Sequence, residues 1–481
     1  MKENKRDKEG LPPRMKLPGA EERRQSNRLF VEAVPVWYSR NGQVNPEWLS
    51  ACKEERNLTE SLMEQIADPL NLNKAYQQVK SNGGSAGVDD MKVEALQEWL
   101  GNNLTHLQEQ LLNGNYQPQM VRGVQIPKPG GGKRQLGIPT VTDRLVQQAI
   151  HQVLSVRYEP TFSENSYGFR PNKNAHQALK QAGNYVAQGK NNVIDLDLEK
   201  FFDEVNHHRL MWLLSRRIGD KRVLQLIHRY LKAGMLQEGL TEQRIKGTPQ
   251  GSPLSPLLSN IVLDELDKEL EQRGHCYVRY ADDVKIFVGS KRRASEVKAN
   301  IAKYITEKLK LKVNESKSRI CKGYELNFLG HSILPKGEIG LSKQSEQRLK
   351  DKVREVTKRN RGISLEEMLK ELRRKLQGWL NYFRYAKMSN KMEAIDGWIR
   401  RKQKCFRLKL KQCKRTIGIV RWLRKLGVEE KLSWRTALSG KGWWRISNSP
   451  ALNIGMNKMW FAQQGCYSLS ENYKSLHRKS L

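Results

Sequence analysis

Three aspartates are the residues best suited to chemistry in this sequence. Asp282 and Asp283 stand between the runs 276–279 and 284–288. Both runs are rich in β-branched and aromatic residues, which predicts two strands with the acids at a hairpin tip. Two aspartates at a turn are usually ordinary turn chemistry, because Asp bonds its own backbone there. Asp197, however, ends another strand-like run, so we expect three carboxylates at adjacent strand ends.

Three carboxylates in that arrangement suit two Mg²⁺ ions, because hard cations prefer oxygen ligands. Two ions about 3.5–4 Å apart stabilise both the attacking and the leaving oxygen of an in-line displacement. The attack of a 3′-hydroxyl on an α-phosphate, with pyrophosphate leaving, is such a displacement. The three acids therefore predict a metal centre of the polymerase type.

Three segments carry a resemblance to a known family. Residues 280–283 read YADD, residues 197–203 read DLEKFFD, and residues 246–256 read KGTPQGSPLSP. Together they resemble the reverse transcriptases encoded by group II introns, from about residue 57 to the end of the chain. The resemblance implies an RNA-directed DNA polymerase that uses two Mg²⁺ ions and deoxynucleoside triphosphates (dNTPs). It implies catalytic roles for Asp197, Asp282 and Asp283, and metal contacts at Asp197, Leu198, Asp282 and Asp283.

Further residues are assigned to the incoming nucleotide. Strand-like flanks surround a glycine-rich turn at 129–132 with cations on both sides, and such a tip can hold a triphosphate. A solvated basic turn is the alternative. In the family, an aromatic residue five positions after the first catalytic aspartate excludes a 2′-hydroxyl; here it is Phe202, with a buried core residue as the alternative, while Phe201 is expected in the core. The implied nucleotide contacts are Lys128, Arg134, Phe202, Gln250 and Lys317.

The segment 167–171 also matches the family, in which it lies beside the template strand. Its Phe169 has a simpler alternative, as a residue of the hydrophobic core.

The charge of the chain points to a polyanionic partner. Lys and Arg number 86 against 51 Asp and Glu, which gives a formal net charge of +35, and the sequence pI is about 9.9. Nucleic acid is the first expectation and an anionic membrane surface the competitor. No run of ~18 consecutive apolar residues occurs, so no spanning helix is expected.

One basic stretch stands out near the C-terminus. No acidic residue occurs over 397–428, and Trp398, Phe406 and Trp422 interleave with the cations. A run of like charges is usually a solvated face, but the aromatic residues favour an ordered face on RNA. The expected RNA contacts are Arg400, Arg401, Lys402, Lys404, Arg407, Lys409 and Lys411.

The expected fold class is α+β. The resemblance implies a right-hand polymerase, with fingers and a palm whose antiparallel sheet carries the hairpin, followed by an α-helical thumb and maturase region. Apolar spacing predicts helices over 57–78 (with a second one over 71–79), 142–158, 174–188 and 257–272, and one continuous apolar stripe over 365–383. The expected divisions are a basic leader at 1–50, fingers and palm at 51–341, the thumb and maturase X domain at 342–425, and a basic aromatic nucleic-acid-binding region at 426–481.

The six cysteines do not favour a zinc site, since none forms a Cys-x-x-Cys pair. Many intron reverse transcriptases end in an endonuclease module with clustered Cys and His, and no such module is recognisable here. Scattered single cysteines suit a reducing compartment, so we expect a cytoplasmic protein of the bacterial cytosol or nucleoid, with an organelle also compatible.

The function predicted from the resemblance is RNA-directed DNA synthesis together with binding of the protein's own group II intron RNA. That binding would assist splicing and retrohoming by target-primed reverse transcription. The expected partners are intron RNA, an RNA template with a DNA primer, and target DNA, without a membrane. Two alternatives remain: a splicing-only RNA-binding maturase, disfavoured by the three acids, and a reverse transcriptase of a retron or defence system, disfavoured by the X-like segment 376–385.

Overall fold

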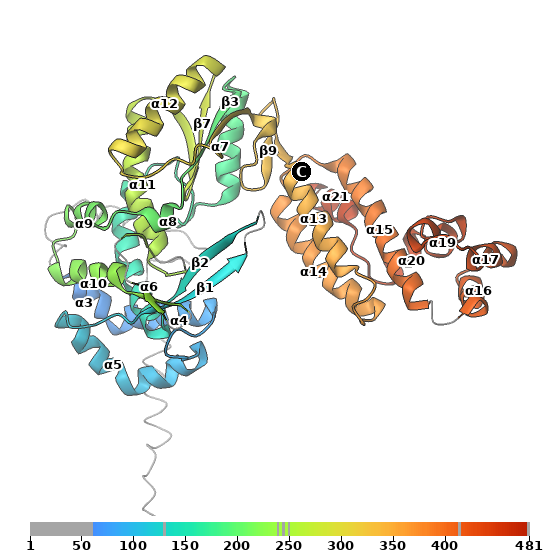
Figure 1. Ribbon diagram of the computed structural model, residues 1–481, viewed down its shortest axis with the longest axis horizontal. Helices are drawn as coiled ribbons and strands as arrows, with labels where there is room; N and C mark the ends of the chain where they lie inside the picture. Colours follow the sequence, from blue (N-terminus) through green and yellow to red (C-terminus); the bar gives the residue numbers. More distant parts are fainter. Residues whose placement is uncertain are drawn as a thin grey trace, which may run out of the picture. The chain divides into compact units, whose positions relative to one another are not determined.

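The computed structural model describes residues 61–127, 131–237, 240–242, 246–248, 251–411 and 415–478 (Figure 1). The expected leader at 1–50, together with Lys128 and Gln250, lies outside the described residues. The chain divides into two compact units, the first formed by 1–162 with 202–262 and the second by 163–201 with 263–481. Among the described residues, no helix is both long enough and apolar enough to cross a lipid bilayer.

The first unit combines helices with a four-stranded sheet of order β2-β1-β4-β5. The predicted basic hairpin is confirmed, because β1 and β2 pair antiparallel with Ile126 opposite Arg134. The helical segment expected over 57–78, with a second helix over 71–79, forms two helices over its described residues. They are separated at Asp68, whose side chain accepts hydrogen bonds from two backbone N–H groups of the helix that begins with Pro69. The elements of the first unit are α3 (Leu62–Ala67), α4 (Pro69–Asn82), η1 (Val93–Ala95), α5 (Leu96–Leu112), β1 (Val121–Pro127), β2 (Lys133–Ile138), α6 (Val141–Tyr158), η2 (Glu159–Thr161), α8 (Phe201–Glu204, of which the residues from 202 on belong to this unit), α9 (His207–Ser215), α10 (Lys221–Lys232), β4 (Met235–Gln237) and β5 (Leu240–Glu242).

The second unit contains the sheet that carries the three aspartates, in the order β6-β7-β3-β8. All neighbouring strands pair antiparallel, which confirms the predicted hairpin and the α+β class. Helix α7 covers one face of this sheet, and α11 and α12 lie on the other (Figure 1). These elements are α7 (Ala175–Ala187), β3 (Asn192–Asp197), α11 (Ser255–Gln272, of which the residues from 263 on belong to this unit), β6 (Cys276–Tyr280), β7 (Asp283–Val288), α12 (Lys291–Glu307), β8 (Arg319–Lys322), η3 (Gly323–Glu325), β9 (His331–Ile333) and β10 (Ile339–Leu341).

A buried ion pair fixes β6 to α11. The side chains of Arg279 and Asp267 are both 0% exposed. The Arg279 Nε donates to the Asp267 carboxylate at 2.8 and 3.0 Å, and its Nη1 donates to the Ala281 carbonyl oxygen at 3.0 Å. Burial raises the pKa of Asp267, against the attraction of the guanidinium. The pair therefore links the hairpin turn to a helix through groups that have no access to water.

The rest of the second unit is helical and has two hydrophobic cores. The predicted stripe of α14 is confirmed, because its apolar residues are buried at spacings of three and four. The last helix, α21, packs against α14 and α15, and its Tyr473 hydroxyl donates to the Ala386 carbonyl oxygen at 2.8 Å. The functional boundary expected between 425 and 426 stays a prediction. The helices are α13 (Lys343–Val356), α14 (Leu365–Phe383), α15 (Ser389–Lys411), α16 (Arg415–Lys425), α17 (Glu430–Ala437), α18 (Trp443–Ile446), α19 (Pro450–Gly455), α20 (Lys458–Gln463) and α21 (Leu469–Arg478).

Helix α15 contributes to both cores, Phe406 to one and Leu408 to the other. This position forces one of its cations inward. Lys404 is only 8% exposed, and its Nζ donates to Asn453 Oδ1 at 2.7 Å. Burial lowers the pKa of Lys404 to about 8, because the charged form loses its hydration.

Lys404 should make the stability of the fold depend on pH. An unfolded lysine titrates near pH ~10.4, so between about pH 8 and that value the unfolded chain binds more protons than the folded one. The free energy of unfolding therefore rises with pH across this window. Lys404→Met should lose that rise in urea unfolding measured from about pH 7.5 to 10, whereas Lys409→Met, on an exposed position of the same helix, should keep it. Parallel pH profiles for wild type and Lys404→Met would contradict this account.

The Arg279–Asp267 pair should dominate the stability of the second unit. Removing one partner of a buried pair costs ~3–5 kcal/mol, because the other charge stays buried and uncompensated. We expect Arg279→Met to lower the thermal unfolding midpoint by several degrees, and Arg279→Met with Asp267→Leu to recover most of the loss. Arg292→Met is the matched control, since Arg292 is 92% exposed. A double variant as unstable as Arg279→Met would show that the unpaired charge is not the cause.

Candidate active site

The end of the antiparallel sheet brings the three aspartates together in the backbone. Asp197 is the register partner of Asp283 in the β3–β7 pairing. Tyr280 pairs with Asp283 across the hairpin, so Ala281 and Asp282 form its two-residue turn. The main chain of Asp197 is fixed on both sides, because its N–H donates to Ser318 Oγ at 3.0 Å and its carbonyl oxygen accepts from Asn314 N–H at 2.8 Å.

The hairpin turn is strained and closely packed. Ala281 has a φ of 57°, in the left-handed region that a residue with a side chain rarely adopts. Such a conformation persists only when the surroundings determine it. The backbone of Gly168 packs directly against this turn, because a Cβ on Gly168 would lie 2.3 Å from the Ala281 nitrogen. Together with the Arg279 hydrogen bond to the Ala281 carbonyl, this contact holds the turn in one position.

A buried lysine lies beside the acids. Lys285 forms ion pairs with both Asp283 and Asp195, and the register places Asp195 directly opposite Lys285. Burial raises the pKa of Asp283, and Asp195 and Asp282 add to this effect against the attraction of Lys285. Burial alone would lower the pKa of Lys285, but the two carboxylates raise it. The lysine therefore supplies positive charge to a cluster of acids that would otherwise repel one another.

The chemistry of these groups fits a hard divalent cation, because the side-chain donors are carboxylate oxygens. Asp197 is partly exposed. Leu198 has a buried hydrocarbon side chain without a ligand atom, so its main-chain carbonyl oxygen is the atom that it can offer a metal. Over the residues that the structure describes, no three His, Cys, Asp or Glu side chains already converge on a common metal position. The Asp283 carboxylate is instead engaged by Lys285.

One predicted nucleotide contact lies next to the acids. The Lys317 Nζ is 3.8 Å from Asp197 Oδ2, and its side chain is largely exposed. Arg134 is exposed on β2 of the first unit. The nucleotide roles of Lys317 and Arg134, like those of Lys128 and Gln250, stay predictions.

Phe202 is held through its backbone. It lies in α8 and is partly exposed, whereas Phe201 is buried, as expected for a core residue. The Phe202 carbonyl oxygen accepts from Thr248 N–H at 2.6 Å. Gly247 has a φ of 90°, and a Cβ on it would come within 2.9 Å of the same oxygen. The block 246–248 thus supports Phe202, whose role in sugar selection stays a prediction.

Phe169 is not a core residue, so that alternative is wrong. Its side chain is 54% exposed, and its φ of 57° is again left-handed. Its ring centroid lies 6.4 Å from that of Tyr280. An exposed aromatic residue in a strained backbone beside the aspartate hairpin marks a surface that a ligand can contact.

The predicted RNA contacts do not lie on a single face of α15. Successive residues of a helix are turned by about 100°, so Arg400, Lys404, Arg407 and Lys411 share one side while Lys402 and Lys409 share another. Lys404 is buried against α19 and Lys409 is exposed. The side chain of Lys411 lies outside the described residues.

Arg401 lies between these two sides of α15. Its guanidinium stacks 3.8 Å from the Trp444 ring centroid. All seven RNA contacts on α15 stay predictions.

The residues missed by sequence reasoning are the ones that position the acids: Arg279, Asp267, Lys285 and Asp195. A signal for two of them was present. Arg279 and Lys285 each stand inside an apolar strand, where a charge is rarely buried without a partner. The partners themselves could not be identified, because pairing depends on strand register and on which face α11 covers.

Comparisons with known proteins agree with this arrangement. Residues 126–333 match the family described as "Reverse transcriptase (RNA-dependent DNA polymerase)". Residues 346–425 match the family described as "Group II intron, maturase-specific domain". The first match contains the whole aspartate-bearing sheet, and the second runs from α13 to the end of α16.

Two curated relatives extend the comparison. Protein YkfC of Escherichia coli is 33% identical over 353 residues, which cover 65% of this chain and 92% of YkfC. The group II intron-encoded protein LtrA of Lactococcus lactis is 32% identical over 327 residues, or 54% of each chain. The chain thus spans nearly all of the first relative and about half of the second. It belongs to the reverse transcriptases that carry a group II intron maturase-specific domain, and it is an RNA-directed DNA polymerase.

Proposed function

We propose that DNA synthesis takes place where β3 ends beside the β6–β7 hairpin, with Asp197, Asp282 and Asp283 as the carboxylates that hold Mg²⁺. The observation that carries this proposal is the register pairing of Asp197 with Asp283, one residue from Asp282. When bound, the metal ions supply charge stabilisation to the attacking and leaving oxygens. The main-chain carbonyl of Leu198 is the fourth donor that the proposal includes.

The surrounding residues bind and select the nucleotide in this proposal. Lys317 is close enough to Asp197 to contact a phosphate bound there. Arg134, Lys128 and Gln250 complete the binding of the dNTP. Phe202 lies under the sugar and excludes a 2′-hydroxyl.

Lys285 acts on the carboxylates rather than on the nucleotide. It is buried and engages Asp283, so it lowers the repulsion among the acids before a cation arrives.

Asp282→Ala should reduce DNA synthesis by at least ~10³-fold, because catalysis here depends on fixed charge at the reacting phosphate. The measurement is primer extension on an RNA template with purified protein and Mg²⁺. Asp351→Ala is the control, since Asp351 is an exposed acid on α13. Extension by Asp282→Ala within tenfold of wild type would remove Asp282 from the active site.

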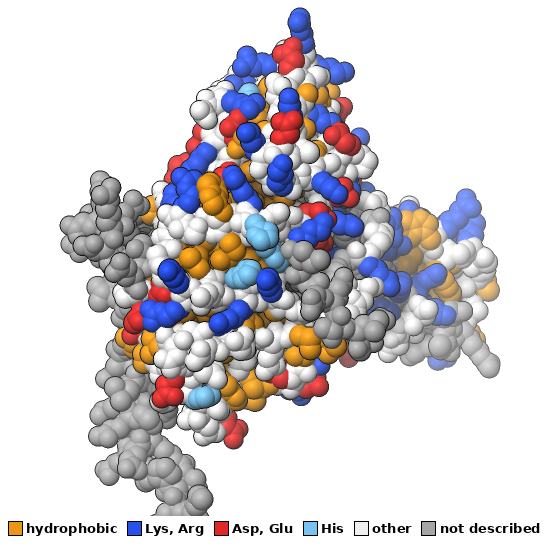
Figure 2. Space-filling view, turned by 60° about the vertical axis from the view of Figure 1, so that its left-hand side comes forward, with side chains coloured by type: hydrophobic (Ala, Val, Ile, Leu, Met, Phe, Trp, Pro, Cys, Tyr) orange, Lys and Arg blue, Asp and Glu red, His pale blue; other side chains and the backbone are white. Residues whose placement is uncertain are grey.

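We infer that the helical part of the second unit binds group II intron RNA to assist splicing and retrohoming, and that target DNA is a further partner. The maturase-specific match over 346–425 and the similarity to the group II intron-encoded protein LtrA support this. Charge alone does not locate the surface, because Lys and Arg side chains lie on several separate parts of the face in Figure 2, with acidic and hydrophobic side chains among them. The described cysteines are free thiols, which suits the cytoplasmic location that we also propose.

Arg400 and Arg407 are the α15 cations best suited to this role. They lie two helical turns apart on one side and are partly exposed, and neither has a carboxylate partner among the described residues. The Arg407 Nε is buried without a hydrogen-bond partner in the described structure. A phosphate cannot reach this buried atom, so the proposed RNA contact is made by the part of Arg407 that is exposed.

The two activities should separate. Asp282→Ala with Asp283→Ala should abolish DNA synthesis and leave protein-assisted splicing within about twofold of wild type, since RNA binding by phosphate contact and shape needs no catalytic carboxylate. Arg400→Gln with Arg407→Gln should lower splicing of the cognate precursor at low Mg²⁺ by about tenfold or more and spare extension of a short primer.

The matched control for the second variant is Arg292→Gln with Lys303→Gln, which removes the same charge from α12, where both cations are ion-paired. Parallel loss of both activities in the two folded test variants would mean that the surfaces are not separable.

A further inference from the structure

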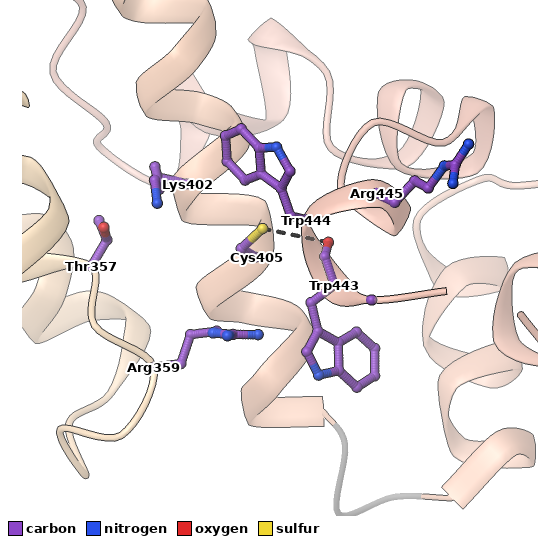
Figure 3. A pocket seen from close by; sticks show the side chains of 8 residues that line it. Thr357, Arg359, Lys402, Cys405, Trp443, Trp444 and Arg445 are labelled. Atoms are coloured by element: carbon purple, nitrogen blue, oxygen red, sulfur yellow. Dashed lines mark hydrogen bonds between the residues drawn. The ribbon is translucent and has the colours of Figure 1, made fainter. Parts of the chain in front are cut away.

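A cavity of about 470 Å³ opens in the helical part of the second unit. Its walls come from three segments: the loop after α13 with Thr357 and Arg359, helix α15 with Lys402 and Cys405, and the start of α18 at 442–445. In Figure 3 the indoles of Trp443 and Trp444 flank Cys405, whose Sγ donates to the Trp443 carbonyl oxygen. The volume falls within the ~300–1,000 Å³ typical of small-ligand sites.

The cavity is electropositive. No acidic residue lines it, and neither Arg359 nor Lys402 has a carboxylate partner among the described residues. Burial lowers the pKa of Lys402, and the positive charges of Arg354 and Arg359 add to the effect. An anion between Arg359 and Lys402 would relieve this repulsion, and a phosphate is the anion that such a pair of cations best accommodates.

The cavity also offers an aromatic surface. Trp444 is 41% exposed. Its ring is supported by the Arg401 guanidinium, whose Nη2 also donates to the Trp444 carbonyl oxygen at 2.9 Å. Trp443 is partly buried against the second hydrophobic core of the helical part. The indoles are thus fixed in place, which reduces the entropy lost when a flat ring stacks on them.

We propose that this cavity binds one unstacked nucleotide of a single-stranded RNA, with its phosphate between Arg359 and Lys402 and its base against Trp444. The proposal rests on the proposed RNA-binding function and adds the form of RNA that is recognised. A paired base cannot enter a cavity of this size, whereas bases of single strands stack on aromatic side chains. The cavity would therefore distinguish a loop or an end from a duplex.

Gly442 allows a test that removes no existing contact. A Cβ on Gly442 would meet nothing within 4 Å, and its φ of −60° suits any residue. Gly442→Glu adds a carboxylate to the cavity, and Gly442→Gln adds the same bulk without charge. Gly440→Glu is the matched control, because Gly440 is equally unobstructed but does not line the cavity. Binding of a 12-nucleotide oligouridylate to the full-length protein is measured by fluorescence anisotropy.

We expect Gly442→Glu to weaken binding of the oligouridylate by about tenfold or more, because a like charge beside a phosphate is repulsive. Gly442→Gln should have a smaller effect, and Gly440→Glu should remain within about twofold of wild type. Equal effects of Gly442→Glu and Gly440→Glu would overturn the proposal. Tighter binding of the deoxyuridine 12-mer than of the oligouridylate would overturn the assignment to RNA.

The base contact is tested with Trp444→Leu. Stacking is worth ~1–3 kcal/mol per base, so binding of the oligouridylate should weaken roughly 5- to 100-fold. A 12-mer of abasic ribose phosphates should bind Trp444→Leu and wild type equally. Trp434→Leu, which removes a similarly exposed indole outside the cavity, should change neither. Equal weakening with both 12-mers would show that no base is bound, and would overturn the proposal.

Oligouridylate binding and splicing, measured together, distinguish a failure of the cavity proposal from a failure of the proposed RNA-binding function. Normal oligouridylate binding by Gly442→Glu and Trp444→Leu, with splicing still lost in Arg400→Gln with Arg407→Gln, would reject the cavity alone. Unchanged splicing in that α15 variant would reject the proposed RNA-binding function itself.

Discussion

The buried ion pair between Arg279 and Asp267 is the interaction on which the candidate active site depends. Arg279 is the penultimate residue of β6, two residues before the turn residue Ala281, and its guanidinium joins Asp267 on α11 to the Ala281 carbonyl oxygen. Burying two charges is costly, and neither partner has water as an alternative. The turn therefore has one stable position rather than several. Carboxylates held in advance need no rearrangement when charge develops at a reacting phosphate.

The rigidity of the hairpin turn alone does not explain how several carboxylates can lie close together despite their mutual repulsion. Asp195, Asp197 and Asp283 lie on the same face of the sheet by the alternation of strand side chains. Lys285 stands on that face as well and engages two of them. Burial and the neighbouring Asp195 and Asp282 raise the pKa of Asp283, and the attraction of Lys285 opposes this effect. The buried lysine therefore offsets the repulsion among these carboxylates, and in the proposed site it would compete with a metal ion for Asp283.

The fold was largely predictable because its signals are local. Strand composition on both sides of Asp282 and the helical stripe of 365–383 require only neighbours in the chain. The carboxylate site was predictable as a set of acids at strand ends, while their metal and catalytic roles stay predictions. Lys285 as the partner of Asp195, and Gly168 against Ala281, depend on register and on contacts over long sequence separations. The periodicity of apolar residues along the chain does not indicate such contacts. Phe169 was wrongly considered a possible core residue, because residue type alone does not distinguish an aromatic residue in a strained, exposed turn from a buried one.

The basic run on α15 shows why charge density in a sequence does not mark a binding surface. The helix distributes consecutive cations around its axis, and packing then selects among them. Lys404 is used inside the fold, and Arg401 fixes an indole. The cations that gain most from a phosphate are those without a carboxylate partner, because a pre-existing ion pair must be broken before a new one forms. Arg359, from a loop outside the run, meets that condition beside Lys402. In the proposal, the surface for RNA is therefore set by the cations that folding leaves without a carboxylate partner next to aromatic rings, which the order of the sequence alone does not identify.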